Sequence, residues 1–281
     1  MNVEHLTGVL GARISGLDLT TLNEQQAASL RAAICQHQVV VIPGQALSPA
    51  QQTAFSHQLG PFSPVPFVEP LAGFPEVISV VKEAFEPDAF NFGGVWHSDF
   101  SFLESPPAFT ILQAIDVPTV GGDTVWASMT AAWEALTPDQ QERFTEMTAV
   151  HSASASYSPA QQALHSGLSS MDIRTSTDAD TQEHPLVCVH PETGEQTLFF
   201  NGTYVRSLRG SDLDSPAAVE KTLHWLHQWT THVRFTFRHR WRNGDVVIWD
   251  NRSTQHVALN DYPGQRRQLH RTTVAGTPPN K

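Results

Sequence analysis

The feature that most constrains the fold is a series of short strand-like segments joined by turns. They are rich in β-branched and aromatic residues and lie at 109–117, 122–129, 197–205, 233–241 and 245–250. Parallel strands need long crossover connections, usually helices, and these segments lack them. We therefore expect a mainly β fold, an antiparallel sandwich or barrel with helices packed outside it, in an α+β arrangement. The link Arg242-Asn243-Gly244-Asp245 predicts a hairpin between the last two segments.

Helices are predicted mainly before and between these strands. Apolar residues at helical spacing indicate a helix within 21–38, followed by the buried strand 39–44. Capping signals with proline at the first helical position start helices after Ser48, Thr137 and Ser215. The connection 154–183 is too long for a turn, and strand-like sequence continues on both sides of it. We interpret it as an active-site lid within one domain that spans 1–281.

Composition excludes several classes of partner. The 281 residues carry a formal net charge of −11, whereas nucleic-acid-binding proteins need a basic face. The sequence has neither a membrane-length apolar run nor a basic leader followed by an apolar stretch, which predicts a cytoplasmic protein without membrane contact. Cys35 and Cys188 lie far apart, outside any C-x-x-C pattern, and are interpreted as ordinary buried thiols.

The chemistry centres on the segment VWHSDFSF at 95–102. On an extended chain His97 and Asp99 point to the same face, although such a pair is often only a hydrogen-bonded pair at a strand end. Aromatic neighbours that could wall a pocket surround the pair, and His256 follows the apolar strand VVIWD. Two histidines and one carboxylate form the facial triad of non-haem Fe(II) oxygenases, which leaves coordination positions open.

The C-terminal segment GQRRQLHRTTVAG places two arginines on one face of a strand. Alternation puts Arg267 and Arg271 on one side and Arg266 and His270 on the other. A buried guanidinium implies an anionic partner held by two hydrogen bonds. We expect Arg266 and His270 to tolerate substitution better than their neighbours. His151, beside Ser and Tyr residues, is a weaker candidate for a pocket position.

Four motifs in order resemble the taurine dioxygenase family of Fe(II)- and 2-oxoglutarate-dependent oxygenases. They are WHSDFSFLESPPA, VGGDTVWASM, WDNRSTQHVALNDY and GQRRQLHRTTVAG, and the resemblance extends over nearly the whole chain. It implies a double-stranded β-helix (jelly roll), with Fe(II), the co-substrate 2-oxoglutarate and dioxygen as reaction partners. Homo-oligomers are common in the family, which leaves a homo-oligomer open for this chain.

The resemblance also assigns roles to individual residues. It implies that His97, Asp99 and His256 bind iron and that Thr124 and Arg267 bind the distal carboxylate of 2-oxoglutarate. Trp249 and Phe102 would form apolar walls around the co-substrate, although core packing is the ordinary role of such residues. Positions on the substrate side are Arg271, for an anionic group, together with Phe100, Phe199, Asn201 and Val65. Core packing explains Phe199 and Asn201 nearly as well.

The substrate implied by the resemblance is a small organic anion with an apolar body. Taurine dioxygenases carry a sulfonate-binding histidine near the position of Val65, and an asparagine near that of Gly93, so taurine itself is disfavoured. The stretch PVPFVEPLAGFPEV is closer to the aryloxyalkanoate dioxygenase and alkylsulfatase branches, in which hydroxylation beside an ether or ester oxygen fragments the product. The alternatives are an amino-acid or natural-product hydroxylase, a hydrolytic zinc enzyme and a cupin-like metal-binding protein without oxygenase activity.

Overall fold

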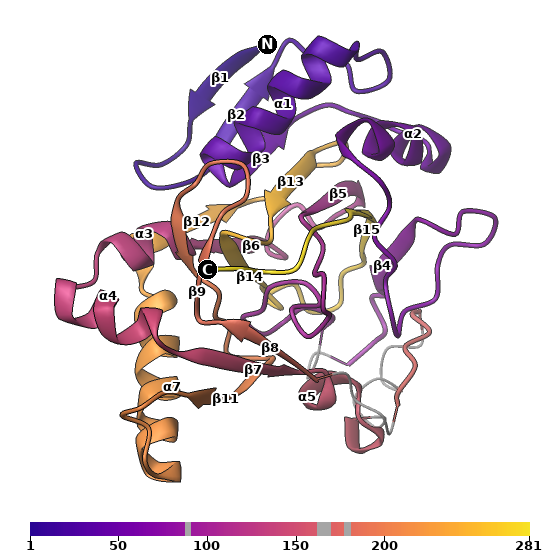
Figure 1. Cartoon of the computed structure of the whole chain (residues 1–281). Coiled ribbons are helices and arrows are strands. Elements are labelled where there is room, and N and C mark those ends of the chain that lie inside the picture. Colours follow the sequence, from indigo (N-terminus) through magenta and orange to yellow (C-terminus); the bar gives the residue numbers. More distant parts are fainter. Residues whose placement is uncertain (88–90, 162–169, 177–180) are drawn as a thin grey trace.

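The computed structural model describes residues 1–87, 91–161, 170–176 and 181–281 (Figure 1). Part of the predicted lid at 154–183 lies outside these residues. Its described part contains the short helix α5 (Ser154–Tyr157), the 3-10 helix η1 (Pro159–Gln161) and the beginning of β8 (Thr181–Pro185).

A seven-stranded sheet forms the larger part of the framework. Its strands, in order across the sheet, are β1 (Asn2–His5), β2 (Ala12–Ser15), β3 (Val39–Ile42), β13 (Val246–Asp250), β5 (Phe109–Asp116), β15 (Arg267–Val274) and β4 (Ile78–Lys82). All neighbouring pairs are antiparallel except β2 and β3. The centre of the sheet is apolar on both faces, since every residue of β3 and β13 is buried. Such strands need cover on both sides.

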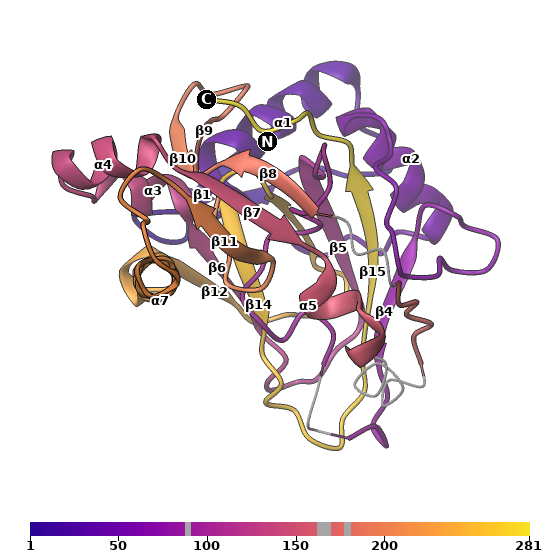
Figure 2. The ribbon, with the colours of Figure 1, turned by 60° about the horizontal axis from the view of Figure 1, so that its bottom comes forward.

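Three smaller sheets complete the β structure. One contains β12 (Thr236–His239), β6 (Thr124–Ser128) and β14 (Thr254–Ala258), and another contains β11 (Val205–Arg209), β7 (Thr148–Ser152) and β8. The third pairs β10 (Gln196–Leu198) with β9 (Val187–Val189). Figure 2 shows β6, β12 and β14 on one side and β5 and β15 of the large sheet on the other.

The predicted hairpin between the last two strand segments is wrong. A turn does form, because the Asp245 amide donates to the Arg242 carbonyl at 2.9 Å. However, β12 pairs with β6 in a small sheet, whereas β13 lies between β3 and β5 in the large one. The physical reason is burial, since a strand that is apolar on both faces takes a central position and is paired on both edges.

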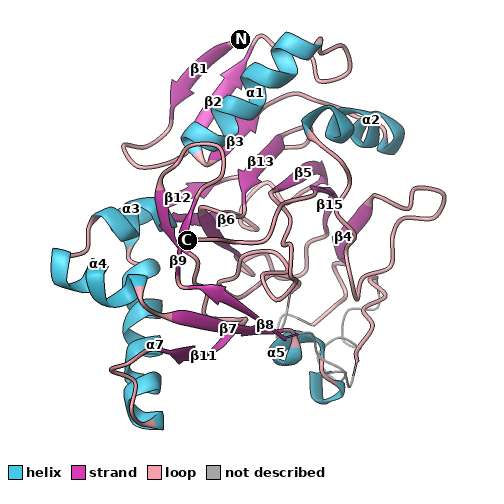
Figure 3. Ribbon diagram, viewed as in Figure 1, coloured by secondary structure: helices cyan, strands magenta, loops and turns pink. Residues whose placement is uncertain are grey.

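Helices cover the sheets from outside, as predicted (Figure 3). Helices α1 (Glu24–His37) and α2 (Pro49–Leu59) pack on one face of the large sheet through a shared apolar cluster. Helices α3 (Met129–Glu134), α4 (Pro138–Thr145) and α7 (Pro216–Thr230) pack on the smaller sheets, and the 3-10 helix η2 (Val233–Phe235) precedes β12. The predicted capping residues Ser48, Thr137 and Ser215 each accept a backbone hydrogen bond.

The space between the large sheet and the β6–β12–β14 sheet holds a separate apolar cluster. Val247 and Leu269 from the large sheet meet Trp126 and Phe237 from the small one. The inward face of β15 therefore points to this space, and the candidate site lies along it. No helix in the described part of the chain is both long and apolar enough to cross a membrane.

Candidate active site

Two distant segments bring the three predicted metal ligands together. The His97 amide donates to the His256 carbonyl at 2.9 Å, and the His256 amide donates back to the His97 carbonyl at 2.7 Å. Asp99 follows two residues later, and one ligand atom from each of the three side chains lies within 4.8 Å of the others. All three side chains are buried. Backbone hydrogen bonds therefore hold the ligand set in place without help from a metal.

The protonation states of this cluster suit a metal ion. His97 donates from Nδ1 to the Val95 carbonyl at 2.7 Å, and its Nε2 lies 3.6 Å from Asp99 Oδ1. Burial, with His97 close by, lowers the pKa of His256 to about 3, so this imidazole is neutral at ordinary pH. Burial alone would raise the pKa of Asp99, but the hydrogen bond with His97 and the positive charge of Arg271 hold it below its usual range. Two imidazoles and one carboxylate are ligands that fit Fe(II).

An inner recess extends from the triad to the predicted co-substrate positions. Thr124, Trp249 and Arg267 line it together with the three ligands. The buried Arg267 guanidinium donates to the Gly122 carbonyl at 3.0 Å, lies 3.5 Å from the Thr124 hydroxyl, and forms no ion pair with any described residue. Burial lowers the pKa of Arg267. The Arg267 guanidinium is therefore a desolvated cation next to the triad, and such a group can bind the carboxylate of an added ligand.

A larger cavity of about 850 Å³ also reaches the triad, where His97 and Asp99 line it. Arg271 lines it and is 4% exposed, with Nη1 3.7 Å from Asp99 Oδ1, while its Nε and Nη2 are buried and have no hydrogen-bond partner among the described residues. Phe100, whose backbone is left-handed at φ 48°, also lines the cavity and lies under the Arg271 guanidinium. Arg267 and Arg271 both face inward, as the alternation along β15 predicted.

The outward face of β15 is less open than we expected. Arg266 is half-buried and pairs with Glu83 and Asp116, both at 3.0 Å. His270 is buried beneath α2, where Gln52 donates to its carbonyl at 3.0 Å. Its position on the opposite face is confirmed, but its burial makes the expected tolerance to substitution doubtful on packing grounds.

Four predicted wall or substrate positions lie away from both cavities. Phe102 is fully buried behind Phe100, against Tyr204. Phe199 stacks on His151, and Asn201 donates to the Ser101 hydroxyl at 2.9 Å. Val65 packs on the apolar cluster that includes Phe102. Phe199 follows β10 directly, its amide donates to the Leu186 carbonyl at 2.8 Å, and this backbone pairing holds its side chain against His151.

His151 is likewise a core residue. It is fully buried, and its Nδ1 lies 2.9 Å from the Ser101 hydroxyl. Burial, with His184 close by, lowers its pKa to about 3. It therefore stays neutral and supports the segment behind the metal ligands without lining either cavity.

Several cavity residues were not predicted from the sequence. Tyr157 of α5 and Tyr204 have buried side chains that line the large cavity, and Leu259, Arg206 and His227 also line it. The only indication in the sequence was the Ser- and Tyr-rich stretch after His151, which contains Tyr157. Asp99 is the one carboxylate in the described lining of this cavity.

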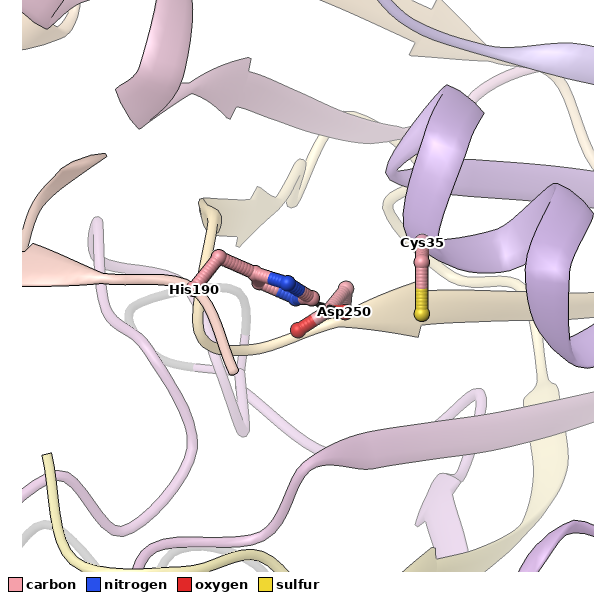
Figure 4. Close-up of side chains that lie close together, drawn as sticks. All are labelled: Cys35, His190 and Asp250. Carbon is pink, nitrogen blue, oxygen red and sulfur yellow. Dashed lines mark hydrogen bonds and ion pairs between the residues drawn. The ribbon is translucent and has the colours of Figure 1, made fainter. Parts of the chain in front are cut away.

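A second cluster of potential ligands lies elsewhere, where Cys35 of α1 approaches His190 and Asp250 (Figure 4). It already contains a cation, because Arg252 donates to both oxygens of Asp250, at 2.8 and 2.6 Å, and its Nη2 lies 3.6 Å from the Cys35 sulfur. Burial raises the pKa of the Cys35 thiol to about 12. We therefore interpret this cluster as structural. Both cysteines are buried and free, as predicted.

Comparison with known proteins gives a consistent result. The family described as "Taurine catabolism dioxygenase TauD, TfdA family" matches residues 2–273. An alkylsulfatase from Acinetobacter baylyi is 36% identical over 98% of this chain and 85% of its own, and a (S)-phenoxypropionate/alpha-ketoglutarate-dioxygenase from Delftia acidovorans is 33% identical over 96% and 93%. The crystal structure of a taurine dioxygenase from Burkholderia xenovorans superposes with a TM-score of 0.82 at 32% identity, covering 99% of this chain and 92% of that one. The chain therefore belongs to the TauD, TfdA family of dioxygenases.

Proposed function

We propose that this chain is an Fe(II)- and 2-oxoglutarate-dependent dioxygenase acting on small organic anions, with a jelly-roll domain spanning residues 1–281. The observation that carries the proposal is the placement of two buried guanidinium groups, Arg267 and Arg271, beside one buried His–Asp–His triad. A metal with open positions between two anion sites suits a reaction that joins a dicarboxylate co-substrate to an anionic substrate.

The chain's residues divide the work between them. His97, Asp99 and His256 would hold iron, and Arg267 with Thr124 would hold the distal carboxylate of 2-oxoglutarate. When bound, iron and 2-oxoglutarate supply the oxidation, in which dioxygen converts 2-oxoglutarate to succinate and carbon dioxide and hydroxylates a C–H bond. Trp249 and Leu269 would exclude water from the co-substrate recess.

The outer cavity favours a substrate with one anionic end and an apolar body. Arg271 offers buried, unpartnered N–H groups to the anion, and aromatic side chains line the remaining space. A substrate ammonium group would lack a counter-ion, because Asp99, the only carboxylate of the described lining, is committed to the metal. This disfavours taurine and amino acids. Among organic anions we propose sulfate esters, on the likeness to the alkylsulfatase.

Hydroxylation of a sulfate ester would occur at the carbon bonded to the ester oxygen. The product carries a hydroxyl group and a sulfate group on one carbon. The hydroxyl group then loses its proton, and the bond between this carbon and the sulfate oxygen breaks. Inorganic sulfate is released and an aldehyde remains. An aryloxyalkanoate hydroxylated at the same type of position would release a phenol, so the leaving group identifies the substrate class.

The test is a panel of five compounds, four of them with a six-carbon chain, supplied with Fe(II), ascorbate and 2-oxoglutarate. We expect hexyl sulfate to stimulate succinate formation and to release sulfate and hexanal in equal amounts. Hexanesulfonate, phenoxypropionate, hexanol and hexylamine report on the anion, the leaving group and the charge. Asp99→Ala should abolish turnover. Succinate without substrate stimulation by any anion, or none at all, would contradict the proposal.

The two alternatives from other classes explain less of the site. A hydrolytic zinc enzyme could use the same triad. It would not need a buried arginine such as Arg267 beside the metal that lacks an acidic side chain as partner among the described residues. A cupin-like binding protein could share the scaffold, yet it also needs no second anion site next to the metal. Neither is favoured by the relatives, which are dioxygenases or act on sulfate esters by name.

A further inference from the structure

We infer that Thr110 and Asn251 are positioning residues that aim one oxygen of Asp99 at the metal and hold the other away from it. The inference rests on the proposed function, since it concerns the metal ligand assigned there. It comes from a chain of buried hydrogen bonds that starts at Trp249 and ends on the Asp99 carboxylate.

The contacts along this chain are short and continuous. The Trp249 indole lies 2.9 Å from Asn251 Oδ1, and Asn251 Nδ2 lies 2.9 Å from the Thr110 hydroxyl. The Thr110 hydroxyl lies 2.7 Å from Asp99 Oδ2. All four residues are at most 2% exposed. Solvent therefore does not compete for any of these groups.

The chemistry of the first member fixes the direction of the whole chain. An indole N–H can only donate, so the Asn251 atom facing it must be the carbonyl oxygen. Asn251 then presents its NH₂ group to Thr110, whose hydroxyl accepts that bond. The hydroxyl proton of Thr110 is left for Asp99 Oδ2. Every donor points toward the carboxylate, and a chain of this kind strengthens its members.

The consequence is a division of labour between the two oxygens of Asp99. Oδ2 is taken up by Thr110, while Oδ1 lies 3.6 Å from His97 Nε2 and faces the ligand cluster. A carboxylate fixed in this way offers one oxygen to a metal. The coordination position that a second oxygen would take stays free for the reactants.

Asn251 also fixes the backbone that carries the ligand. Its carbonyl accepts from the Ser98 hydroxyl at 2.8 Å, and its Oδ1 lies 3.4 Å from the Asp99 amide. Trp249 adds a link to the other side of the site, because its ring lies 4.7 Å from that of His256. The segment 249–251 thus supports two of the three ligands, in the way that hydrogen-bond partners of metal ligands commonly tune affinity.

The test compares Thr110→Val with two other threonine variants in the binding of Mn(II), followed by the EPR signal of the free ion. Thr273 is a matched control because it is the cross-strand neighbour of Thr110, is equally buried, and donates to the Ser63 carbonyl at 2.7 Å. We expect Thr110→Val to weaken Mn(II) binding about 10- to 100-fold. Thr110→Ser should stay within about threefold of the wild type, and so should Thr273→Val.

Asn251→Asp provides a second test if Thr110→Val does not fold. Its carboxylate can still accept from Trp249 but would also accept the Thr110 proton, which turns that hydroxyl away from Asp99. We expect weaker Mn(II) binding even though an added negative charge should attract the cation. Unchanged or tighter binding in Asn251→Asp, or equal losses in Thr110→Val and Thr273→Val, would overturn the inference. Mn(II) binding by the wild type, and its loss in Asp99→Ala, tests the proposed metal site separately.

Discussion

Replacement of Arg267 by methionine should weaken the binding of 2-oxoglutarate without lowering the stability of the protein. In the free protein the Arg267 guanidinium is buried, has no described acidic partner and donates to the Gly122 carbonyl at 3.0 Å. Methionine retains much of the apolar stem and removes the charge. We expect the metal-free variant to be as stable as the wild type or more stable, while its affinity for 2-oxoglutarate collapses.

The magnitudes follow from opposing contributions. The variant loses a charge-assisted hydrogen bond worth about 1.5–3 kcal/mol and a distant contact with the Trp241 ring. The variant is also relieved of the desolvation penalty of a buried, unpaired ion, which is several kcal/mol and destabilises the wild type. We expect a net change in the free energy of unfolding between zero and about +2 kcal/mol. Binding of 2-oxoglutarate loses a desolvated ion pair, about 3–5 kcal/mol, or roughly two to three and a half powers of ten in Kd.

Two measurements check this prediction. Urea denaturation of the metal-free proteins gives the free energy of unfolding, and calorimetric titration of the Mn(II)-loaded proteins gives the affinity for 2-oxoglutarate. Arg266→Met is the control, because Arg266 points outward to Glu83 and Asp116. It should change stability by less than about 1 kcal/mol and leave the affinity unchanged. A variant Arg267→Met that is strongly destabilised and still binds 2-oxoglutarate well would show that Arg267 is a structural cation.

Three further predictions concern other charged groups. Arg271→Met should raise the KM for an anionic substrate about 100-fold, because about one desolvated ion pair is lost, and should not change the Kd for 2-oxoglutarate. Equal kinetics for Arg271→Met and the wild type would exclude Arg271 from the substrate site. Arg252→Met should cost about 3 kcal/mol in urea denaturation, because it removes the guanidinium that pairs with the buried Asp250 carboxylate, and a loss below about 1 kcal/mol would contradict this. His151 has a folded pKa of about 3, below its unfolded value of about 6.5, so the unfolded chain binds the extra proton and stability falls as pH drops from about 6.5 toward 3. Between pH 7 and pH 5 this loss is about 2 kcal/mol, and it should be absent from the stability profile of His151→Asn, whereas parallel profiles of the two proteins would refute the assignment.

The parts of the site that could be predicted from sequence are those set by alternation and by ligand type. His97 and Asp99 converge because they are two residues apart on an extended segment, and Arg267 and Arg271 share a face for the same reason. Neither the pairing partner of a strand nor the neighbours that its side chains meet follow from such local rules. This is why the predicted hairpin before β13 was wrong and why the contact of Phe199 with His151 was not predicted.

Other residues could not be identified because they have no distinctive neighbours in the sequence. Thr110 lies in an ordinary β-prone stretch, and Asn251 follows an apolar strand. Their connection to Asp99 exists only once β5 and β13 pair and place Thr110 opposite Trp249. Tyr157 and Tyr204 reach the large cavity in the same way, from segments that are distant along the chain.

The regular repeat of β15 limits how the specificity of this site can change. Arg267 and Arg271 are four residues apart on one strand, which separates their backbone positions by about 13 Å. Only every second residue faces inward, and Leu269 is the position between them. A guanidinium can therefore move along the strand only in steps of about 7 Å. An anionic substrate of intermediate length must therefore be accommodated by the size of other side chains in the cavity. Evolution or design can change the apolar walls gradually, but it can change the distance between the two guanidinium groups only in these steps.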